Sequence, residues 1–212
     1  MSVAHIERLY SVAEYLDFER TSQERHEYLD GQVYAMAGES LQHAAICTNL
    51  SGVLRSQLLG GPCQVFSKDV KVRSGPLPVI TSSKKGLFSY PDILVVCGEP
   101  DVLDRHDDVV MNPRVIIEVL SPSTERFDRT QKFMRYRQWL PSLTDYVLVA
   151  QNQPFIEQFS RGENGVWTIG PVTSDLADSI RIGSIDCSLP LAEIYDRVTF
   201  PAPKATEGDR EG

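Results

Sequence analysis

The spacing of apolar residues along the chain predicts a mixture of helices and strands. Over 41–59 apolar residues recur close to helical spacing, and the Gly60-Gly61 pair that follows is a common helix end. The segments 90–97 (YPDILVVC) and 114–120 (RVIIEVL) are instead nearly continuous apolar runs that are rich in β-branched residues. Such runs are typical of central strands covered on both faces. We therefore predict a protein of the α/β (α+β) class.

Local signals predict the remaining elements. Ser11, followed three residues later by Glu14, forms a capping box for a short helix over 11–18. Asp30-Gly31 within HEYLDGQVYAM predicts a tight hairpin near the N-terminus. We further expect strands at 64–73, 145–151 and 180–182, and a peripheral hairpin of 154–160 with 166–170. Residues 74–86 should form a surface loop. We also expect a helix over 124–139, capped by Ser123 or Thr124, and a short helix at 189–198. Residues 1–200 should form a single domain, and 201–212 a disordered tail.

Composition excludes a membrane-spanning protein and favours a globular one. The 212 residues are 42% hydrophobic and 24% charged, and no apolar run approaches the roughly 18 residues that a membrane span requires. The first residues lack the basic segment, apolar core and cleavage site of a signal peptide. We therefore expect a cytoplasmic location and no membrane partner.

Four cysteines are scattered along the chain without the paired spacing of a metal site. Cys47, Cys63, Cys97 and Cys187 each lie beside apolar or small residues. We therefore predict buried free thiols in preference to a disulfide or a metal centre.

The net charge of −8 is unfavourable for binding nucleic acid, but the charges are unevenly distributed. Acidic residues dominate from Asp145 onwards, whereas two segments, 68–85 and 124–139, are basic. These segments bracket the apolar run at 90–97. They are either solvated faces or contacts to phosphate groups, and the residues predicted to bind DNA are Lys68, Lys71, Arg73, Lys84, Lys85 and Arg135.

Two carboxylates interrupt the apolar central strands. Asp92 begins one strand and Glu118 lies within the other, so both converge near one sheet edge if the strands pair. Burying two ionised carboxylates costs several kcal/mol each unless something compensates. A divalent cation, basic residues or a raised pKa would each do so. Alternatively, Asp92 caps a turn after Pro91 while Glu118 pairs with an arginine.

The chain resembles a known nuclease family. A Pro-Asp pair before an apolar strand, with a Glu in a second apolar strand, is similar to the PD-(D/E)XK nuclease superfamily. More closely, HEYLDGQVYAMAG, His43, YPDILVV, EVLSPST and the spacing Asp128, Lys132, Tyr136 resemble the Uma-type family of predicted restriction endonucleases. The similarity runs from about Glu24 to Trp167.

This resemblance implies a restriction-endonuclease-like core of α-β-β-β-α-β order, in which a mixed sheet is flanked by helices, with a hairpin added at each end. It also implies DNA phosphodiester hydrolysis with Mg²⁺ or Mn²⁺ held by Asp92 and Glu118. The superfamily normally places a lysine two residues after the Glu, where this chain has Leu120. Lys132 can replace it, or else forms an ion pair with Asp128 one helical turn away on a solvated surface.

Four further residues form a secondary set: Glu27, His43, Asp128 and Tyr136. Glu27 would be an extra metal ligand or hold Lys132 in place, while His43 is a metal ligand or an ordinary helix residue.

Three functions are compatible with these residues. The first is a metal-dependent endonuclease, in which a homodimer would cut both strands of a duplex. The second is a catalytically silent DNA-binding or regulatory module of the same fold. The third is a carboxylate-pair hydrolase acting on another substrate such as a glycoside, which the basic segments and the lack of an aromatic sugar platform disfavour.

Overall fold

The computed structural model describes residues 8–201, so the predicted disordered tail at 201–212 lies almost entirely outside the described residues. A six-stranded sheet forms the centre of the molecule, in the order β11-β10-β9-β8-β6-β3. Its strands are β3 (Cys63–Ser67), β6 (Ile93–Cys97), β8 (Val115–Leu120), β9 (Asp145–Ala150), β10 (Ile156–Arg161) and β11 (Trp167–Ile169). Strands β8 and β9 are parallel and the other neighbours are antiparallel, so the sheet is mixed, as predicted.

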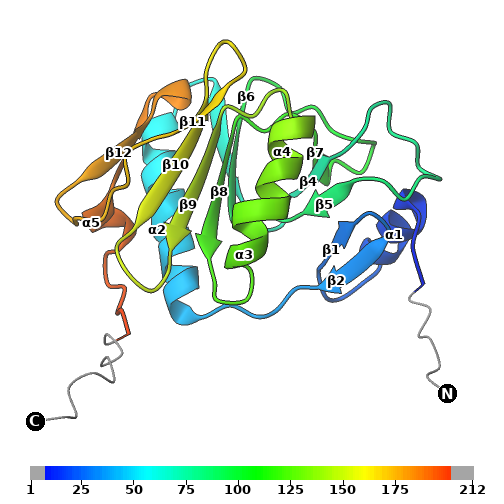
Figure 1. Cartoon of the computed structure of the whole chain (residues 1–212), viewed down its shortest axis with the longest axis horizontal. Helices are drawn as coiled ribbons and strands as arrows, with labels where there is room; N and C mark the ends of the chain where they lie inside the picture. Colours follow the sequence, from blue (N-terminus) through cyan, green and yellow to red (C-terminus); the bar gives the residue numbers. More distant parts are fainter. Residues whose placement is uncertain (1–7, 202–212) are drawn as a thin grey trace, which may run out of the picture.

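Helices cover both faces of this sheet (Figure 1). Helix α2 (Leu41–Leu58) packs on one face, where its apolar side chains form a core cluster with strand residues such as Ile93 and Ile117. Helix α4 (Phe133–Trp139) packs on the other face against Leu94, Ile116 and others. Because side chains alternate along a strand, Glu118 belongs to the same face as Ile116, the face that α4 covers.

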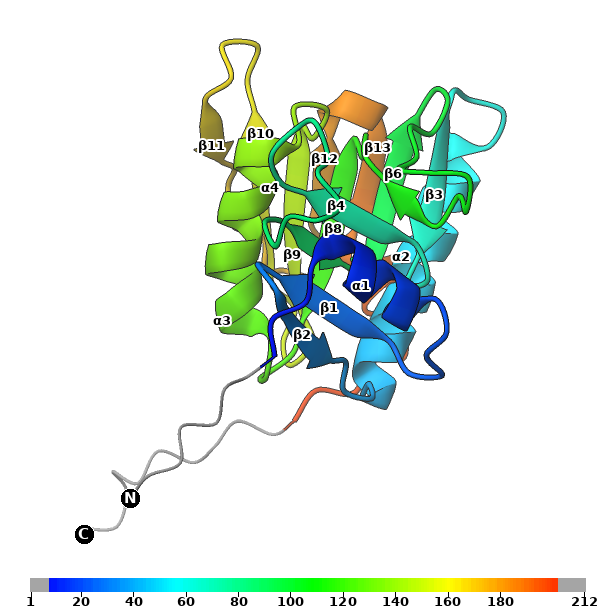
Figure 2. The ribbon, with the colours of Figure 1, turned by 90° about the vertical axis from the view of Figure 1, so that its right-hand side faces the viewer.

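A second sheet lies beside the first in the order β2-β1-β5-β4-β7 (Figure 2). It comprises β1 (His26–Leu29), β2 (Gln32–Ala35), β4 (Lys71–Ser74), β5 (Leu87–Ser89) and β7 (Val109–Val110), and helix α1 (Val12–Glu19) packs against it. The predicted single strand at 64–73 is wrong, because it is divided between β3 and β4. Lys68, between them, has a left-handed φ of 47°, which breaks the extended backbone and directs the chain into the second sheet.

The N-terminal elements form as predicted. Ser11 and Glu14 make both hydrogen bonds of the capping box that begins α1. Asp30 and Gly31 both have positive φ, as the tight turn of the β1–β2 hairpin requires. The chain that links β3 to β6 supplies β4 and β5, so the core order α2-β3-β6-β8-α-β9 agrees with the predicted α-β-β-β-α-β arrangement.

The predicted helix over 124–139 forms at 125–139, with a π-helical turn inside it. It consists of α3 (Glu125–Phe127), a π-helical turn at Asp128–Lys132, and α4. The side chain of Thr124 does not cap it. Instead the Ser121 hydroxyl accepts a hydrogen bond from the Thr124 N–H. Single π-helical turns inside helices are frequent at functional sites.

The C-terminal part has one hairpin more than predicted. Strands β10 and β11 form the expected peripheral hairpin at the sheet edge. Strands β12 (Ser179–Ile182) and β13 (Cys187–Pro190) form a second one, which leaves only a short helix, α5 (Leu191–Ile194), where a helix at 189–198 was predicted.

The cysteine prediction is half wrong. Cys47 and Cys187 are buried free thiols as predicted, but Cys63 and Cys97 form a disulfide. They are directly opposite each other in the antiparallel β3–β6 pair, a proximity that the sequence spacing does not reveal. Within residues 8–201, no helix has the length and apolar character needed to cross a membrane.

Candidate active site

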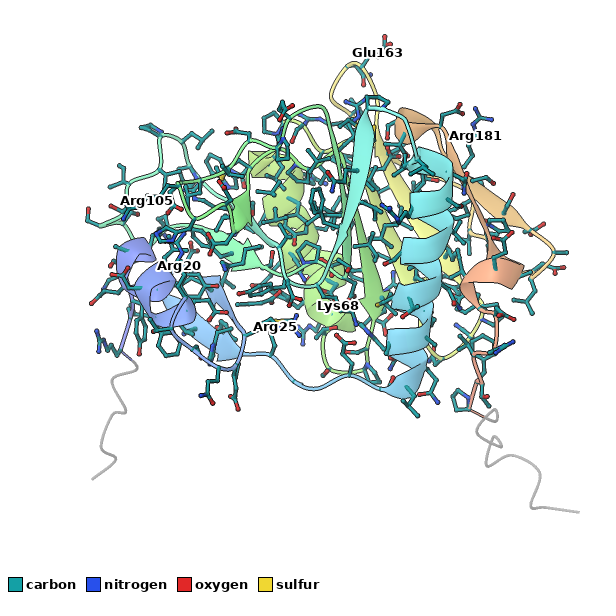
Figure 3. All side chains as sticks on the ribbon, turned by 180° about the vertical axis from the view of Figure 1, so that it is seen from behind. Arg20, Arg25, Lys68, Arg105, Glu163 and Arg181 are labelled. Carbon is teal, nitrogen blue, oxygen red and sulfur yellow. A yellow bond between two sulfur atoms is a disulfide. The ribbon has the colours of Figure 1, made fainter. Side chains whose placement is uncertain are left out.

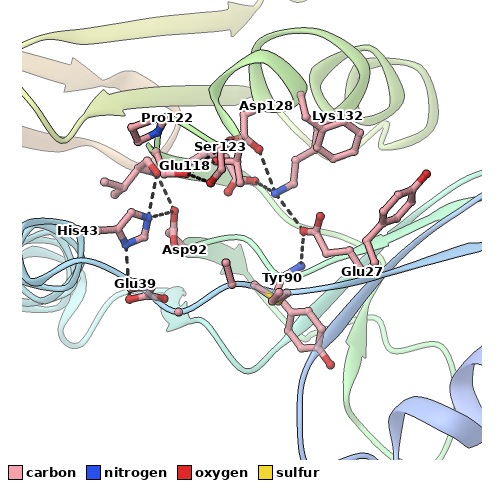
Figure 4. Close-up of a pocket in the computed structure, with 18 of the residues that line it drawn as sticks. Glu27, Glu39, His43, Tyr90, Asp92, Glu118, Pro122, Ser123, Asp128 and Lys132 are labelled. Atoms are coloured by element: carbon pink, nitrogen blue, oxygen red, sulfur yellow. Dashed lines mark hydrogen bonds and ion pairs between the residues drawn. The ribbon is translucent and has the colours of Figure 1, made fainter.

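A cavity of about 710 Å³ opens between the two sheets and the first turn of α2. Both sheets and α2 contribute charged side chains to its lining. The loop before α2 and the helical segment that follows β8 contribute others. The charged lining residues are Glu27, Glu39, His43, Asp92, Glu118, Asp128 and Lys132. Figure 4 shows this cluster in close-up.

Asp92 and Glu118 lie together at the end of two paired strands. Ile93 is opposite Ile117 in the antiparallel β6–β8 pair, so the register continued by one residue places Asp92 opposite Glu118. Both residues line the cavity, and Asp92 Oδ2 accepts a hydrogen bond from the Val119 N–H at 2.8 Å. The predicted convergence of the two carboxylates is therefore confirmed. Asp92 is no turn cap, and Glu118 pairs with a lysine instead of an arginine.

Lys132 extends from the π-helical turn into the same cluster. Its Nζ is 3.0 Å from Glu118 Oε1 and 3.3 Å from both Glu27 Oε1 and Asp128 Oδ1. The Lys132 side chain is only 5% exposed, so these are not contacts on a solvated surface. One buried ammonium thus contacts three carboxylates.

Tyr136 and Glu27 hold this arrangement from two sides. The Tyr136 hydroxyl is 3.4 Å from Glu118 Oε1 and 2.7 Å from the Ser89 hydroxyl. Glu27, on β1 of the second sheet, accepts a hydrogen bond from the Tyr90 N–H at 3.3 Å. The same Glu27 oxygen contacts Lys132, so Glu27 connects the second sheet to the helix that covers the first.

His43 lies on the first turn of α2, on the opposite side of Asp92. Its Nε2 is 3.0 Å from the Val119 carbonyl oxygen and 3.4 Å from Asp92 Oδ2. Its Nδ1 is 3.5 Å from both Glu39 Oε2 and Cys47 Sγ. Sequence reasoning did not identify Glu39 and Cys47, although their spacing of four residues on either side of His43 could have indicated them.

Burial and charge set opposite protonation tendencies on the two central carboxylates. Burial raises the pKa of Glu118 well above its usual range, and the nearby Lys132 charge offsets only part of this effect. Burial acts on Asp92 in the same direction, but the hydrogen bond and charge of His43 outweigh it and lower the Asp92 pKa. Burial has the opposite effect on His43 and lowers its pKa, but the neighbouring Asp92 and Glu39 raise the His43 pKa overall.

The cluster fits a divalent cation. Five carboxyl groups line the cavity, and Lys132 and His43 cannot neutralise all of them; they belong to Glu27, Glu39, Asp92, Glu118 and Asp128. Carboxylate oxygens are the ligands that Mg²⁺ and Mn²⁺ prefer. Cys47 Sγ, His43 and Asp92 also offer ligand atoms within 4.8 Å of one another.

Two of the residues predicted to bind DNA are buried. Lys71 and Arg73 are 5% and 2% exposed, on the second sheet. Lys71 forms an ion pair with Asp108, and Arg73 donates hydrogen bonds to backbone carbonyl groups. The prediction that these two contact DNA is wrong, because neither side chain is exposed to a phosphate backbone.

The other four predicted DNA-binding residues are more accessible. Lys84 and Lys85 are exposed, and Arg135 is half-buried in an ion pair with Asp30. Lys68 forms an ion pair with Glu39, and its carbonyl oxygen accepts a hydrogen bond from Arg25. Figure 3 shows Lys68 and Arg25 next to each other, between α2 and the β1–β2 hairpin.

Comparison with known proteins places the chain in a family. A family model described as "Putative restriction endonuclease" (Uma2) matches residues 12–183. The chain belongs to this family. The predicted resemblance is thus confirmed, and the Uma2 model covers both sheets and every residue of the cluster described above.

Relatives and one solved structure agree with this assignment. The uncharacterised proteins slr1290 and sll1609 of Synechocystis sp. strain PCC 6803 are 34% identical over 190 residues and 30% identical over 178 residues. These alignments cover 90% and 84% of this Uma2 chain and 93% and 96% of the relatives. A crystal structure described as a "putative nuclease belonging to DUF820" from Anabaena variabilis has a TM-score of 0.68 at 13% identity, covering 88% of this chain and 97% of that one. The nuclease-like fold is therefore confirmed.

Proposed function

We propose that this chain is a divalent-metal-dependent deoxyribonuclease whose active site is the cluster around Asp92, Glu118 and Lys132. The observation that carries the proposal is the position of Lys132. Its ammonium is 3.0 Å from Glu118 Oε1, although it comes from a helix and not from the strand position that Leu120 occupies. A buried cation next to two strand carboxylates supports phosphodiester chemistry.

Asp92 and Glu118 would hold Mg²⁺ or Mn²⁺. When bound, the cation would polarise the scissile phosphate and lower the pKa of an attacking water. His43 positions Asp92 through the contact between Nε2 and Oδ2, and the Val119 N–H fixes the same oxygen. The Asp92 carboxylate is thereby held in one orientation before substrate arrives, which avoids reorganisation during the reaction.

Lys132 would interact with the negatively charged phosphate. Glu27 and Asp128 each contact its Nζ at 3.3 Å and so keep the ammonium charged and oriented despite its burial. The neighbouring Glu118 charge raises the pKa of Lys132 well above its usual range against the effect of burial. Lys132 therefore acts as a fixed cation and not as a proton acceptor.

DNA is the proposed substrate, and the exposed cations Lys84 and Lys85 are proposed to contact it outside the cavity. Contacts of this kind would make binding weaken as salt rises. The homodimer and the cytoplasmic location stay predictions.

Cleavage of supercoiled plasmid and of single-stranded DNA in Mg²⁺ or Mn²⁺ tests the proposal. The variants Asp92→Asn, Glu118→Gln and Lys132→Met should each lose at least about 100-fold in rate, as expected for groups that stabilise transition-state charge. Glu163→Gln is the matched control, because Glu163 is exposed at the tip of the β10–β11 loop (Figure 3). This variant should cleave DNA at the wild-type rate. Chelator should abolish cleavage by wild type.

Leu120 occupies the strand position where the superfamily normally has a lysine. This difference favours one alternative, a catalytically silent DNA-binding or regulatory module. Salt-sensitive DNA binding by the wild type with no cleavage in either metal would support that alternative and refute the nuclease. Cleavage that survives Lys132→Met but not the carboxylate variants would instead remove Lys132 from the catalytic set.

A further inference from the structure

The charged cluster occupies only part of the cavity in which it lies. The cavity volume of about 710 Å³ is more than a metal ion and one phosphate group need, and it falls within the range of pockets that enclose small organic ligands. The side chains of Glu118 and Lys132 are only 4% and 5% exposed. A substrate must therefore enter the cavity to bring its phosphate to them, and the remaining volume can hold the group attached to that phosphate.

An aromatic side chain stands next to the cluster. Tyr34 of β2 lies opposite Glu27 of β1 in the antiparallel pair, so both side chains project from the same face of the second sheet. Glu27 Oε1 is 3.3 Å from Lys132 Nζ (Figure 4), and both Glu27 and Tyr34 line the cavity. The neighbouring pair of Tyr28 and Val33 projects from the other face, toward α1. The register thus places Tyr34 on the cavity side, beside a residue that contacts Lys132.

The Tyr34 ring is accessible to a ligand. Tyr34 is 48% exposed, whereas Tyr15 and Tyr28 nearby are fully buried and stack on each other. Met36, which is 37% exposed, and the half-buried Phe127 add further apolar surface to the cavity lining. An exposed aromatic ring next to a site for phosphate suits a nucleic acid base, because every base has a face that stacks on such a ring.

The lining also offers amide groups. Gln131, the residue before Lys132, is exposed, and Gln151 is half-buried and accepts a hydrogen bond from the Ser40 hydroxyl at 3.1 Å. A side-chain amide both donates and accepts hydrogen bonds, as the edge of a base does. Stacking on apolar side chains combined with hydrogen bonds to the base edge is how proteins hold a base outside the duplex.

We propose that the cavity takes an unpaired nucleotide of single-stranded DNA, with its base stacked on Tyr34 and its phosphate at the cluster. This substrate class rests on the proposed nuclease function and names the form of DNA that the site accepts. A paired duplex is too wide to enter the cavity, so one of its nucleotides must first leave the base stack. A nucleotide of a single strand enters without the cost of unpairing, which favours single strands.

Cleavage kinetics on two forms of one oligonucleotide test this substrate class. In Mg²⁺ or Mn²⁺ the single strand should have a kcat/KM at least about ten-fold higher than the fully paired duplex. Tyr34→Ala should raise the KM for the single strand at least about five-fold, because it removes the stacking ring. Tyr34→Phe is the matched control, since it keeps the ring and should keep the wild-type KM. Circular dichroism verifies the fold of both variants.

A binding measurement separates the substrate class from the nuclease activity. Fluorescence anisotropy of the labelled single strand is followed in Ca²⁺, which carboxylates also bind, and denaturing gels verify that the strand stays intact. Tyr34→Ala should bind at least about five-fold more weakly than wild type. Met134→Ala should bind as wild type does, because Met134 is 62% exposed on α4 and does not line the cavity.

The outcomes distinguish the substrate class from the proposed nuclease function. Equal kcat/KM for the two forms of DNA, or a Tyr34→Ala protein that matches Tyr34→Phe in KM and binding, would overturn the substrate class and leave the nuclease intact. No cleavage of either form would refute the nuclease. Preferential binding of the single strand that depends on the Tyr34 ring would even then support the assignment of the cavity, and no binding of the single strand would overturn it.

Discussion

Replacing Lys132 by Met should destabilise the fold strongly, because it removes the one ammonium that contacts three carboxylates in the cluster. Glu118 Oε1, at 3.0 Å, is the nearest of them, and the Glu118 side chain is only 4% exposed. Removing one partner of a buried ion pair costs about 3–5 kcal/mol, since it leaves an uncompensated buried charge. For a chain of 212 residues, this free energy corresponds to a melting temperature lower by roughly 6–20 °C.

Chemical denaturation at pH 7 with EDTA measures this loss without interference from a bound cation. Lys85→Met is the matched control, because Lys85 is exposed and its replacement should change the free energy of unfolding by less than about 0.5 kcal/mol. The double variant Lys132→Met with Glu118→Gln should recover about 1–3 kcal/mol relative to the sum of the single variants, since it removes the unpaired charge as well.

A Lys132→Met protein within about 1 kcal/mol of wild type would refute the reasoning. It would mean that the carboxylates already bind protons or water so well that the lysine adds little. Strict additivity in the double variant would likewise show that Lys132 and Glu118 do not interact.

Three further predictions concern stability away from the cluster. Burial disfavours the charged form of Asp108, but hydrogen bonds from Arg20 and Lys71 outweigh it and lower the pKa to about 2 from 3.8. Asp108→Asn should therefore cost about 2 kcal/mol at pH 7, and guanidinium titrations at lower pH should show the difference disappearing between about pH 4 and pH 2. Cys97→Ser opens a disulfide that spans 34 residues and should cost about 3–4 kcal/mol in urea denaturation, whereas wild type under reducing conditions should match the variant. Gly31→Ala should lower the melting temperature by a few degrees, because Gly31 has a φ of 99° and an added Cβ would lie 3.3 Å from Leu9 Cβ; an unchanged melting temperature would contradict the turn assignment.

Features that depend on neighbouring residues could be predicted from the sequence. The Asp30-Gly31 turn and the Ser11 capping box require only a few consecutive residues. The pairing of Asp92 with Glu118 was also predictable, because two consecutive apolar strands are frequently adjacent in a sheet. The family resemblance and the mixed sheet were correct, and the catalytic role of the two carboxylates stays a proposal.

Features that depend on distant contacts could not be predicted in this way. Charge alone suggested that Arg73 contacts DNA, yet the second sheet buries it, and the basic run at 68–85 gave no indication of this. Spacing left Lys132 with two interpretations, an ion pair on a solvated surface or a residue of the site. The structure excludes the solvated surface, because the π-helical turn and Glu27 of the second sheet bury its ammonium.

The sequence by itself therefore determined the central strands, the local turns and the candidate residues of the cluster. Only the tertiary structure decided which cations are buried, which cysteines pair and which side chains share a cavity. The physical reason is that burial and charge pairing depend on the packing of elements far apart in the chain, whereas turns and strand patterns depend on the few residues that form them.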